Sequence, residues 1–198
     1  CAFVLAFQRE GGWLDFLCRF WLPEERIKLE AKRQRQFFAE WAAAGWLTAT
    51  PGEVIDFGLI RREINALRDA GYAIGEIGYD PARATQLSTE LREEDGFAMV
   101  EVRQGSLTLH EPSKFLEAEI VQRRARATGP PGGPNPLARW MVGNATKRMD
   151  ANGGIAPDKK RSKDKIDFVS AAVTALSRIV GAEKQGRSYL ETEEPLVL

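Results

Sequence analysis

The chain has 198 residues, enough for one domain with a core of its own, and its formal net charge at neutral pH is zero. A neutral chain has no overall field that would attract a polyanion, so such a partner must be sought through local charge clusters. The two cysteines, Cys1 and Cys18, lack metal-site spacing and favour a reducing compartment. The longest apolar run, residues 2–7, is too short for a membrane span and lacks the features of a signal peptide, so no membrane partner is expected.

The first part of the sequence predicts an antiparallel hairpin and then a long helix. Residues 1–8 and 13–22 are rich in bulky apolar side chains and predict two strands, with a glycine turn at 9–12. A proline followed by two acids predicts a helix from 23 to 44. Its polar middle, residues 28–36, indicates a solvated surface helix.

The next part alternates between strands and helices, which is typical of parallel βαβ units. Asp56 is the expected cap of the first of these helices. We therefore expect a mixed sheet flanked by helices, an α/β fold. The elements are a strand at 46–49, a helix at 57–70, a strand at 72–79, a helix at 82–93 and a strand at 97–102.

The C-terminal part predicts a helix from 111 to 126, opened by Pro112, and a mobile Pro/Gly loop at 128–136. A further helix at 136–146 and a hairpin at 149–156, turned at an Asn-Gly pair, follow. We expect one domain over residues 1–186 and an irregular tail over 187–198, where the periodicity ends.

The most informative stretch of the chain is residues 159–176, where a run of cations leads into a predicted apolar helix that contains one carboxylate, Asp167. Asp164 is the expected N-cap of that helix, and its small face (Ser170 to Ala175) could lie close against a sheet. A carboxylate among apolar residues must be paired, hydrogen-bonded or bound to metal. Asp167 either stabilises the helix N-terminus or pairs with Lys163, or it is a metal ligand.

Asp80 is the second carboxylate of interest, because it follows a predicted strand and precedes a predicted helix. In open α/β sheets, ligands bind beyond the carboxyl ends of the strands. Asp80 is therefore either a turn residue or a catalytic carboxylate.

Four patches of the sequence together carry a family resemblance: FWLP from residue 20, YDP from 79, VRQG from 102 and KIDFVSA from 165. With the residues around them, over 20–57, 74–104 and 135–176, the chain resembles the nuclease domain of the large terminase subunit of tailed phages. The resemblance implies an RNase H-like fold and a metal-dependent endonuclease that cuts concatemeric double-stranded DNA during genome packaging in the host cytoplasm.

The resemblance also implies three metal-binding acids, of which Asp80 matches the second and Asp167 the third. The first falls at or before the strand that begins at Cys1, so we expect this acid, and the true start of the strand, upstream of the chain. Two divalent ions, Mg²⁺ or Mn²⁺, are the expected cofactors, because they prefer hard carboxylate ligands. The expected partners are DNA, an upstream ATPase domain of the same protein, the portal and the small terminase subunit.

A cluster of cations near Asp167 predicts phosphate contacts with duplex DNA, without base-specific readout. A solvated polar loop is the alternative. The cluster comprises Lys147, Arg148, Lys159, Lys160, Arg161, Lys163 and Lys165.

The remaining candidates are expected to have other roles. Asp150 and Asp158 are predicted turn residues, Glu76 and Glu101 are expected to face solvent or pair with Arg103, and His110 is expected in a loop without a catalytic role. Two alternative functions remain open: a non-catalytic DNA-binding or assembly module on the same fold, and another RNase H-like enzyme such as a resolvase or transposase.

Overall fold

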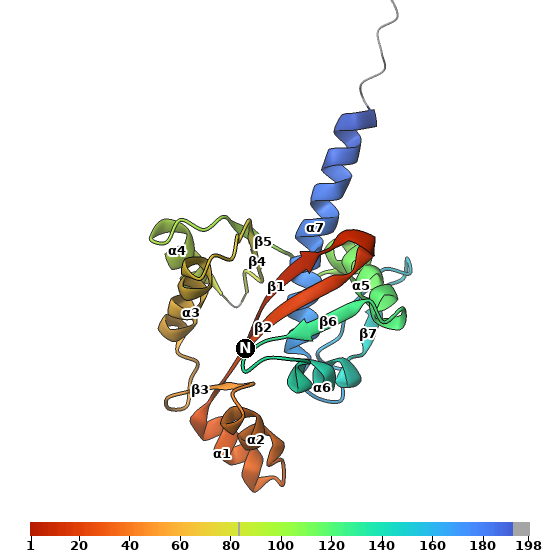
Figure 1. Cartoon of the computed structure of the whole chain (residues 1–198). Coiled ribbons are helices and arrows are strands. Elements are labelled where there is room, and N and C mark those ends of the chain that lie inside the picture. Colours follow the sequence, from red (N-terminus) through yellow and green to blue (C-terminus); the bar gives the residue numbers. More distant parts are fainter. Residues whose placement is uncertain (83, 192–198) are drawn as a thin grey trace, which may run out of the picture.

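The computed structural model describes residues 1–82 and 84–191. Its main sheet is built on an antiparallel hairpin of β1 (Ala2–Gln8) and β2 (Leu14–Pro23), joined by a short 3-10 turn, Glu10–Gly12. β6 (Ala125–Thr128) runs parallel to the first half of β2, and β3 (Thr48–Thr50) runs parallel to its end. The hairpin and the mixed sheet expected from the sequence are confirmed (Figure 1).

A second, two-stranded sheet is formed by the parallel strands β4 (Ile77–Tyr79) and β5 (Met99–Glu101), with α4 (Thr85–Glu93) connecting them. The predicted βαβ unit is confirmed, although β4 is much shorter than the strand expected over residues 72–79. α3 (Phe57–Asp69) precedes it and is capped as predicted, because Asp56 Oδ1 accepts a hydrogen bond of 2.9 Å from the Leu59 backbone N–H.

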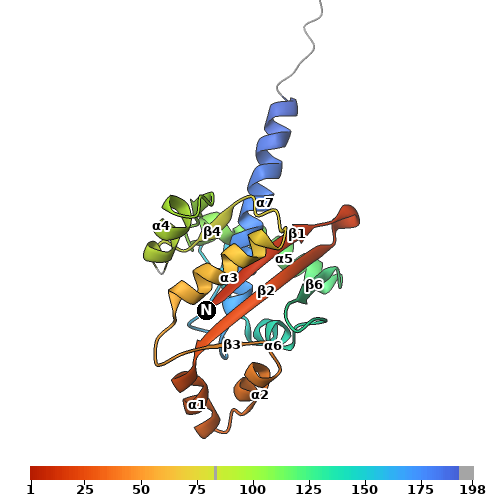
Figure 2. The same ribbon diagram turned by 60° about the vertical axis from the view of Figure 1, so that its left-hand side comes forward.

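Helices cover both faces of the main sheet. α5 (Ser106–Val121), α6 (Pro136–Asn144) and α7 (Asp167–Glu191) pack together on one face, and α3 lies in front of the other face in Figure 2. β7 (Lys147–Met149) and β8 (Ile155–Pro157) form the hairpin predicted between α6 and α7. α7 extends well beyond the sheet in Figure 1.

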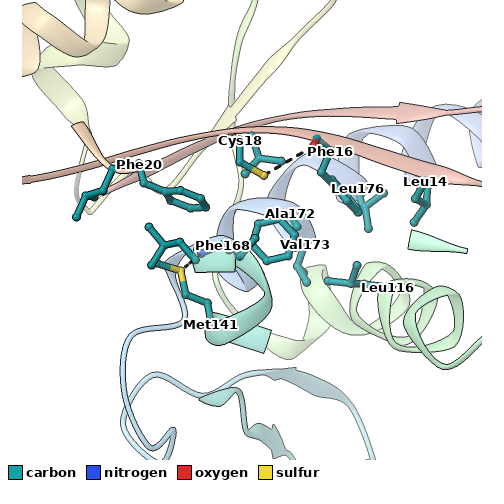
Figure 3. Packing of buried hydrophobic residues seen from close by; sticks show 14 of the residues in the cluster. Leu14, Phe16, Cys18, Phe20, Leu116, Met141, Phe168, Ala172, Val173 and Leu176 are labelled. Atoms are coloured by element: carbon teal, nitrogen blue, oxygen red, sulfur yellow. Dashed lines mark hydrogen bonds between the residues drawn. The ribbon is translucent and has the colours of Figure 1, made fainter. Parts of the chain in front are cut away.

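The largest core lies between the main sheet and α7 (Figure 3). Phe168 is its centre: its ring meets the ring of Phe16 on β2 edge-to-face at 5.6 Å, and its backbone N–H donates to Met141 Sδ at 3.1 Å. Cys18 on β2 is buried beside them, and burial raises the pKa of its thiol to about 12. The second residue of α7 is therefore anchored in the core, which fixes the start of the helix.

The helix predicted over residues 23–44 is wrong in one respect: it is two helices, α1 (Glu24–Lys32) and α2 (Phe37–Ala43). Gln34 has a left-handed backbone, with φ of 61°, so the first helix cannot continue. The polar middle is not simply a solvated surface either. Glu30 is fully buried and forms ion pairs of 2.9 Å with Arg26 and Arg35.

The prediction that Pro112 opens a helix running to residue 126 is also wrong. α5 begins at Ser106 and contains Pro112 in its interior. Proline lacks the N–H that an interior position normally donates, yet here it belongs to the buried stripe of the helix with Leu109, Leu116 and Glu119. The residues after Val121 turn into β6, a strand whose short sequence has little apolar pattern and which depends on pairing with β2.

The predicted tail over residues 187–198 is wrong in its first part, because α7 continues as a helix to Glu191. The rest of that tail lies outside the described residues. Within residues 1–82 and 84–191, the structure contains no helix that is both long enough and apolar enough to cross a membrane.

Candidate active site

Asp80 immediately follows β4, at the carboxyl end of the strand, as predicted. Its side chain is half-buried, and Oδ1 accepts a hydrogen bond of 3.1 Å from the backbone N–H of Ala82. The turn role and the ligand role are therefore compatible, because this hydrogen bond occupies only one of the two carboxylate oxygens.

Asp167 is the first residue of α7, and its side chain is 32% exposed. Its neighbour Phe168 is buried in the core, so the helix start is held firmly while the carboxylate remains partly exposed. The nearest cation is Lys159, whose Nζ lies 3.8 Å from Asp167 Oδ1. The expected partner, Lys163, is not the one observed.

The expected N-cap role of Asp164 is wrong. Its side chain accepts a hydrogen bond of 2.7 Å from the backbone N–H of Lys165, and its other oxygen forms an ion pair with Arg35 between α1 and α2. Asp164 therefore ties the loop before α7 to the helical unit that follows β2.

Asp80 and Asp167 line one cavity of about 420 Å³, bounded by β1, α3, β4 and α7. Cys1, at the start of β1, lines the same cavity, and its amino group donates to the Trp21 carbonyl at 2.9 Å. The start of the first strand therefore shares a cavity with Asp167.

A second cavity, of about 510 Å³, adjoins the first and is lined by four cations of the predicted cluster: Arg148, Lys159, Lys160 and Arg161. Four residues line both cavities and so mark their junction: Asp80, Gln104, Lys159 and Ser170. A carboxylate site and a basic surface are thus contiguous, an arrangement suited to holding a phosphate group beside the acids.

The other three predicted cations have different surroundings. Lys147 forms an ion pair of 2.8 Å with Glu117 on α5. Lys163 is exposed and its backbone N–H donates to the Asn144 carbonyl, while the ammonium of Lys165 lies 5.9 Å from the centre of the Phe38 ring. None of the three lines either cavity.

The turn roles predicted for two further acids are confirmed. Asp150 accepts hydrogen bonds from the backbone N–H groups of Asn152 and Gly154 and from the Ser106 hydroxyl. These hydrogen bonds lower the pKa of Asp150, and the bond from the Ser106 hydroxyl has the largest effect. Asp158 likewise accepts from the backbone N–H groups of residues 160 and 161.

Glu76 and Glu101 are exposed, as one of the two alternatives predicted. Glu76 pairs with Arg178 on α7 at 2.7 Å, and Glu101 accepts a hydrogen bond of 3.2 Å from the Tyr79 hydroxyl, so neither pairs with Arg103. His110 lies inside α5 rather than in a loop, and its Nδ1 accepts a 3.0 Å hydrogen bond from the backbone N–H of Ile155. That contact gives His110 a structural role in holding β8.

The chemistry of the donors fits a hard divalent cation, because Asp80 and Asp167 offer carboxylate oxygens to one cavity. Across residues 1–82 and 84–191, however, no three His, Cys, Asp or Glu side chains gather in a way that could hold a metal ion. Asp80 and Asp167, the two acids that the sequence predicted as ligands, line this cavity together.

The sequence interpretation missed Gln104 and Ser170 at the junction of the cavities. Signals were present for both: Gln104 is part of the VRQG patch, and Ser170 lies three residues after Asp167, on the same side of a helix. Neither signal identifies a site until the segment after β5 is placed next to α7.

The fold as a whole is that of a known structure. The crystal structure of the large terminase of bacteriophage HK97 matches with a TM-score of 0.77 at 24% identity, over 89% of this chain and 36% of that chain. The predicted fold class, an RNase H-like α/β fold with a mixed sheet flanked by helices, is thereby confirmed.

The family follows from the sequence comparison. The family model described as terminase large subunit, endonuclease domain, matches residues 1–183, and the chain belongs to this family. Protein YmfN of Escherichia coli K12 is 32% identical over 173 residues, and the terminase large subunit of phage HK97 is 25% identical over 183 residues. The matches cover 84% and 91% of this chain but only 36% and 34% of those proteins, so the chain spans about a third of their length.

Proposed function

We propose that this chain is a metal-dependent endonuclease domain that cuts concatemeric double-stranded DNA during phage genome packaging. One observation carries the proposal: Asp80 and Asp167, which are far apart in the sequence, line one cavity that adjoins a cavity lined by cations. Membership of the terminase endonuclease family supports the same activity.

The proposed cofactors are two divalent ions, Mg²⁺ or Mn²⁺. When bound, such ions would supply an activated water, a clamp on the phosphate and stabilisation of the leaving oxygen. Asp80 would hold one ion and Asp167 the other. A third carboxylate, on a residue preceding Cys1, would complete the set, since Cys1 itself lines the acidic cavity.

The cations of the second cavity would bind the DNA backbone. Arg148, Lys160 and Arg161 would contact phosphates on the side of the site away from β1. Lys159 lies between the two cavities and 3.8 Å from Asp167, so its ammonium both offsets the carboxylate charge and can reach a phosphate brought to the acids.

The wider setting is proposed on family membership. We infer an upstream ATPase domain in the same protein, contacts with the portal and the small terminase subunit, and action in the host cytoplasm. These two relatives are about three times as long as the segment that this chain matches, which leaves room for a further domain in those proteins.

The first test is Mn²⁺-dependent nicking of supercoiled plasmid by this chain and by a version extended upstream of Cys1. We expect Asp80→Asn and Asp167→Asn to abolish nicking by whichever version cuts, while Asp69→Asn, an exposed carboxylate at the end of α3, leaves it unchanged. Cutting that survives loss of either carboxylate would remove that residue from the site.

The DNA surface is tested by comparing two charge reversals in the same loop. Lys160→Glu, inside the basic cavity, should weaken binding to duplex DNA of any sequence. It should also reduce, by roughly 1, the slope of the logarithm of the binding constant against the logarithm of the salt concentration. Lys163→Glu, outside both cavities, should have a smaller effect. Unchanged binding by Lys160→Glu would contradict the proposed phosphate contact.

A non-catalytic DNA-binding or assembly module is the second candidate function. It is favoured by the absence of a three-ligand metal cluster among residues 1–82 and 84–191. The two candidates separate cleanly in the nicking assay, because a binding module retains salt-dependent DNA affinity but does not cut in either version.

A further inference from the structure

Gln104 stands out at the junction of the two cavities. It follows β5 by three residues, is half-buried, and is one of the four residues that line both cavities. Nothing in the proposed mechanism above uses it. Its place in the sheet gives a reason to consider it together with Asp80.

Asp80 and Gln104 belong to the same face of the β4–β5 pair. Side chains alternate along strands, so Asp80 shares its face with Gly78 and Gln104 shares its face with Val102. That face is the one against α7, because a Cβ atom added at Gly78 would lie 3.1 Å from Val102 Cγ2 and 3.2 Å from Thr174 Cγ2. The pairing continues past the strand ends, with the Val102 N–H donating to the Tyr79 carbonyl at 2.9 Å.

The orientation of the Gln104 amide is fixed by its hydrogen bonds. Nε2 donates to the Val102 carbonyl at 2.9 Å and to Thr174 Oγ1 at 3.4 Å. Because a backbone carbonyl can only accept, the atom facing it must be the amide nitrogen. Both N–H groups are thereby used, and the amide oxygen is the end left free to bind something else.

The oxygen of this amide has no donor among the described residues, whereas the backbone carbonyl of Gln104 is occupied by the guanidinium of Arg148. Gln104 is therefore held at its backbone and at its amide nitrogen. A side chain restrained in this way pays little conformational entropy when its oxygen binds a ligand. Oxygen atoms of this kind are hard donors, suited to Mg²⁺ and Mn²⁺.

We propose that Gln104 supplies, through Oε1, a neutral oxygen ligand to the divalent cation that Asp80 binds. The inference rests on the proposed function, since it concerns the same metal site. A neutral donor adds a ligand without a further negative charge. The ion is then less neutralised by its ligands and attracts a phosphate group more strongly. It also gives the VRQG patch a chemical role.

The test is a titration of the chain with Mn²⁺ in the absence of DNA, in which electron paramagnetic resonance measures the bound and free ion. Gln104→Leu removes the oxygen at similar size and should weaken Mn²⁺ binding by about tenfold. The matched control is Gln86→Leu on α4, an exposed glutamine whose amide bonds only Glu90, and it should bind as the parent does. Unchanged Mn²⁺ affinity in Gln104→Leu overturns the inference, even if the melting temperature falls.

Two further measurements separate this inference from the function it rests on. Asp80→Asn should lose Mn²⁺ binding; if it does while Gln104→Leu does not, the metal site stands and Gln104 is only structural. Duplex affinity measured in EDTA should be the same for Gln104→Leu and the parent, and a loss there without a loss of Mn²⁺ affinity would make Gln104 a DNA contact instead. No Mn²⁺ binding by either the parent chain or the version extended upstream of Cys1 overturns both proposals.

Discussion

The two carboxylates of the candidate site, Asp167 and Asp80, belong to two regions of the molecule with separate hydrophobic cores. Asp167 begins α7, whose apolar face forms the large core with β1, β2, α5 and α6. Asp80 follows β4 in a smaller region, where α3, α4, β4 and β5 share a second core with Trp21. The smaller region supplements its core with charged contacts: Arg61 pairs with Asp95, and Arg68 lies over the Phe97 ring at 4.5 Å.

The difference shows what sets the distance between the carboxylates. Asp167 is fixed by burial of the residue next to it, whereas Asp80 extends from a three-residue strand that meets α7 only along a narrow seam. Two contacts define that seam: Gly78 against Thr174, and Glu76 paired with Arg178. The proposed metal site therefore depends on the larger core for its stability and on the seam for its geometry.

The largest effect is expected in the large core. Phe168→Ala removes a buried ring that packs on Phe16, and it should lower the free energy of unfolding by about 3–5 kcal/mol. Denaturant unfolding followed by circular dichroism measures the loss. Leu107→Ala, at a fully exposed leucine on α5, should change it by less than about 0.5 kcal/mol. Equal losses in the two variants would contradict the assignment of the core.

An intermediate effect is expected at the seam. Gly78→Val forces atoms against Val102 and Thr174 and should cost about 1–3 kcal/mol. Because it separates Asp80 from α7, it should also weaken Mn²⁺ binding more than its stability loss explains. Gly75→Val, where an added Cβ meets nothing within 4 Å, is the control for both measurements. Normal Mn²⁺ affinity in Gly78→Val would mean that the seam does not set the site geometry.

The sequence was sufficient where local physics decides the structure. Asp56 capping α3 and the Asn-Gly turn at residue 152 both follow from short patterns, and both are observed. The small face of α7 was expected to lie near a sheet, and Thr174 does lie against Gly78. Each of these features depends on residues a few positions apart.

Prediction from the sequence failed where the local structure depends on contacts between residues far apart in the chain. The break after α1 depends on Glu30, which is buried because Arg26 and Arg35 neutralise it, and Arg35 also reaches Asp164 far along the chain. β6 exists only through its pairing with β2.

The candidate site, too, has a part that the sequence predicted and a part that it did not. The carboxylates at the strand end and at the helix start could be named in advance. The adjoining cavities, and Gln104 between them, required the packing of β4, and of the segment after β5, against α7.

The smallest effect is expected in the charged surface of the smaller region, and it depends on pH. The Arg61 guanidinium, bonded to Asp95 at 2.6 and 2.8 Å, is the main cause of the pKa of Asp95 lying below its usual 3.8. A carboxylate with a depressed folded-state pKa stabilises the fold above its unfolded pKa, and loses that contribution as the pH falls through the folded value. Arg61→Gln should therefore lower the melting temperature slightly at neutral pH and not at about pH 2.

Melting curves of parent and variant over that pH range measure the difference. Arg62→Gln is the matched control, because the neighbouring Arg62 is 70% exposed and lies 3.9 Å from its nearest carboxylate, so it should melt as the parent does at every pH. If the Arg61→Gln difference persists in acid, the guanidinium acts through packing rather than charge. The smaller region would then resemble the larger one, with packing rather than charge positioning the strand that carries Asp80.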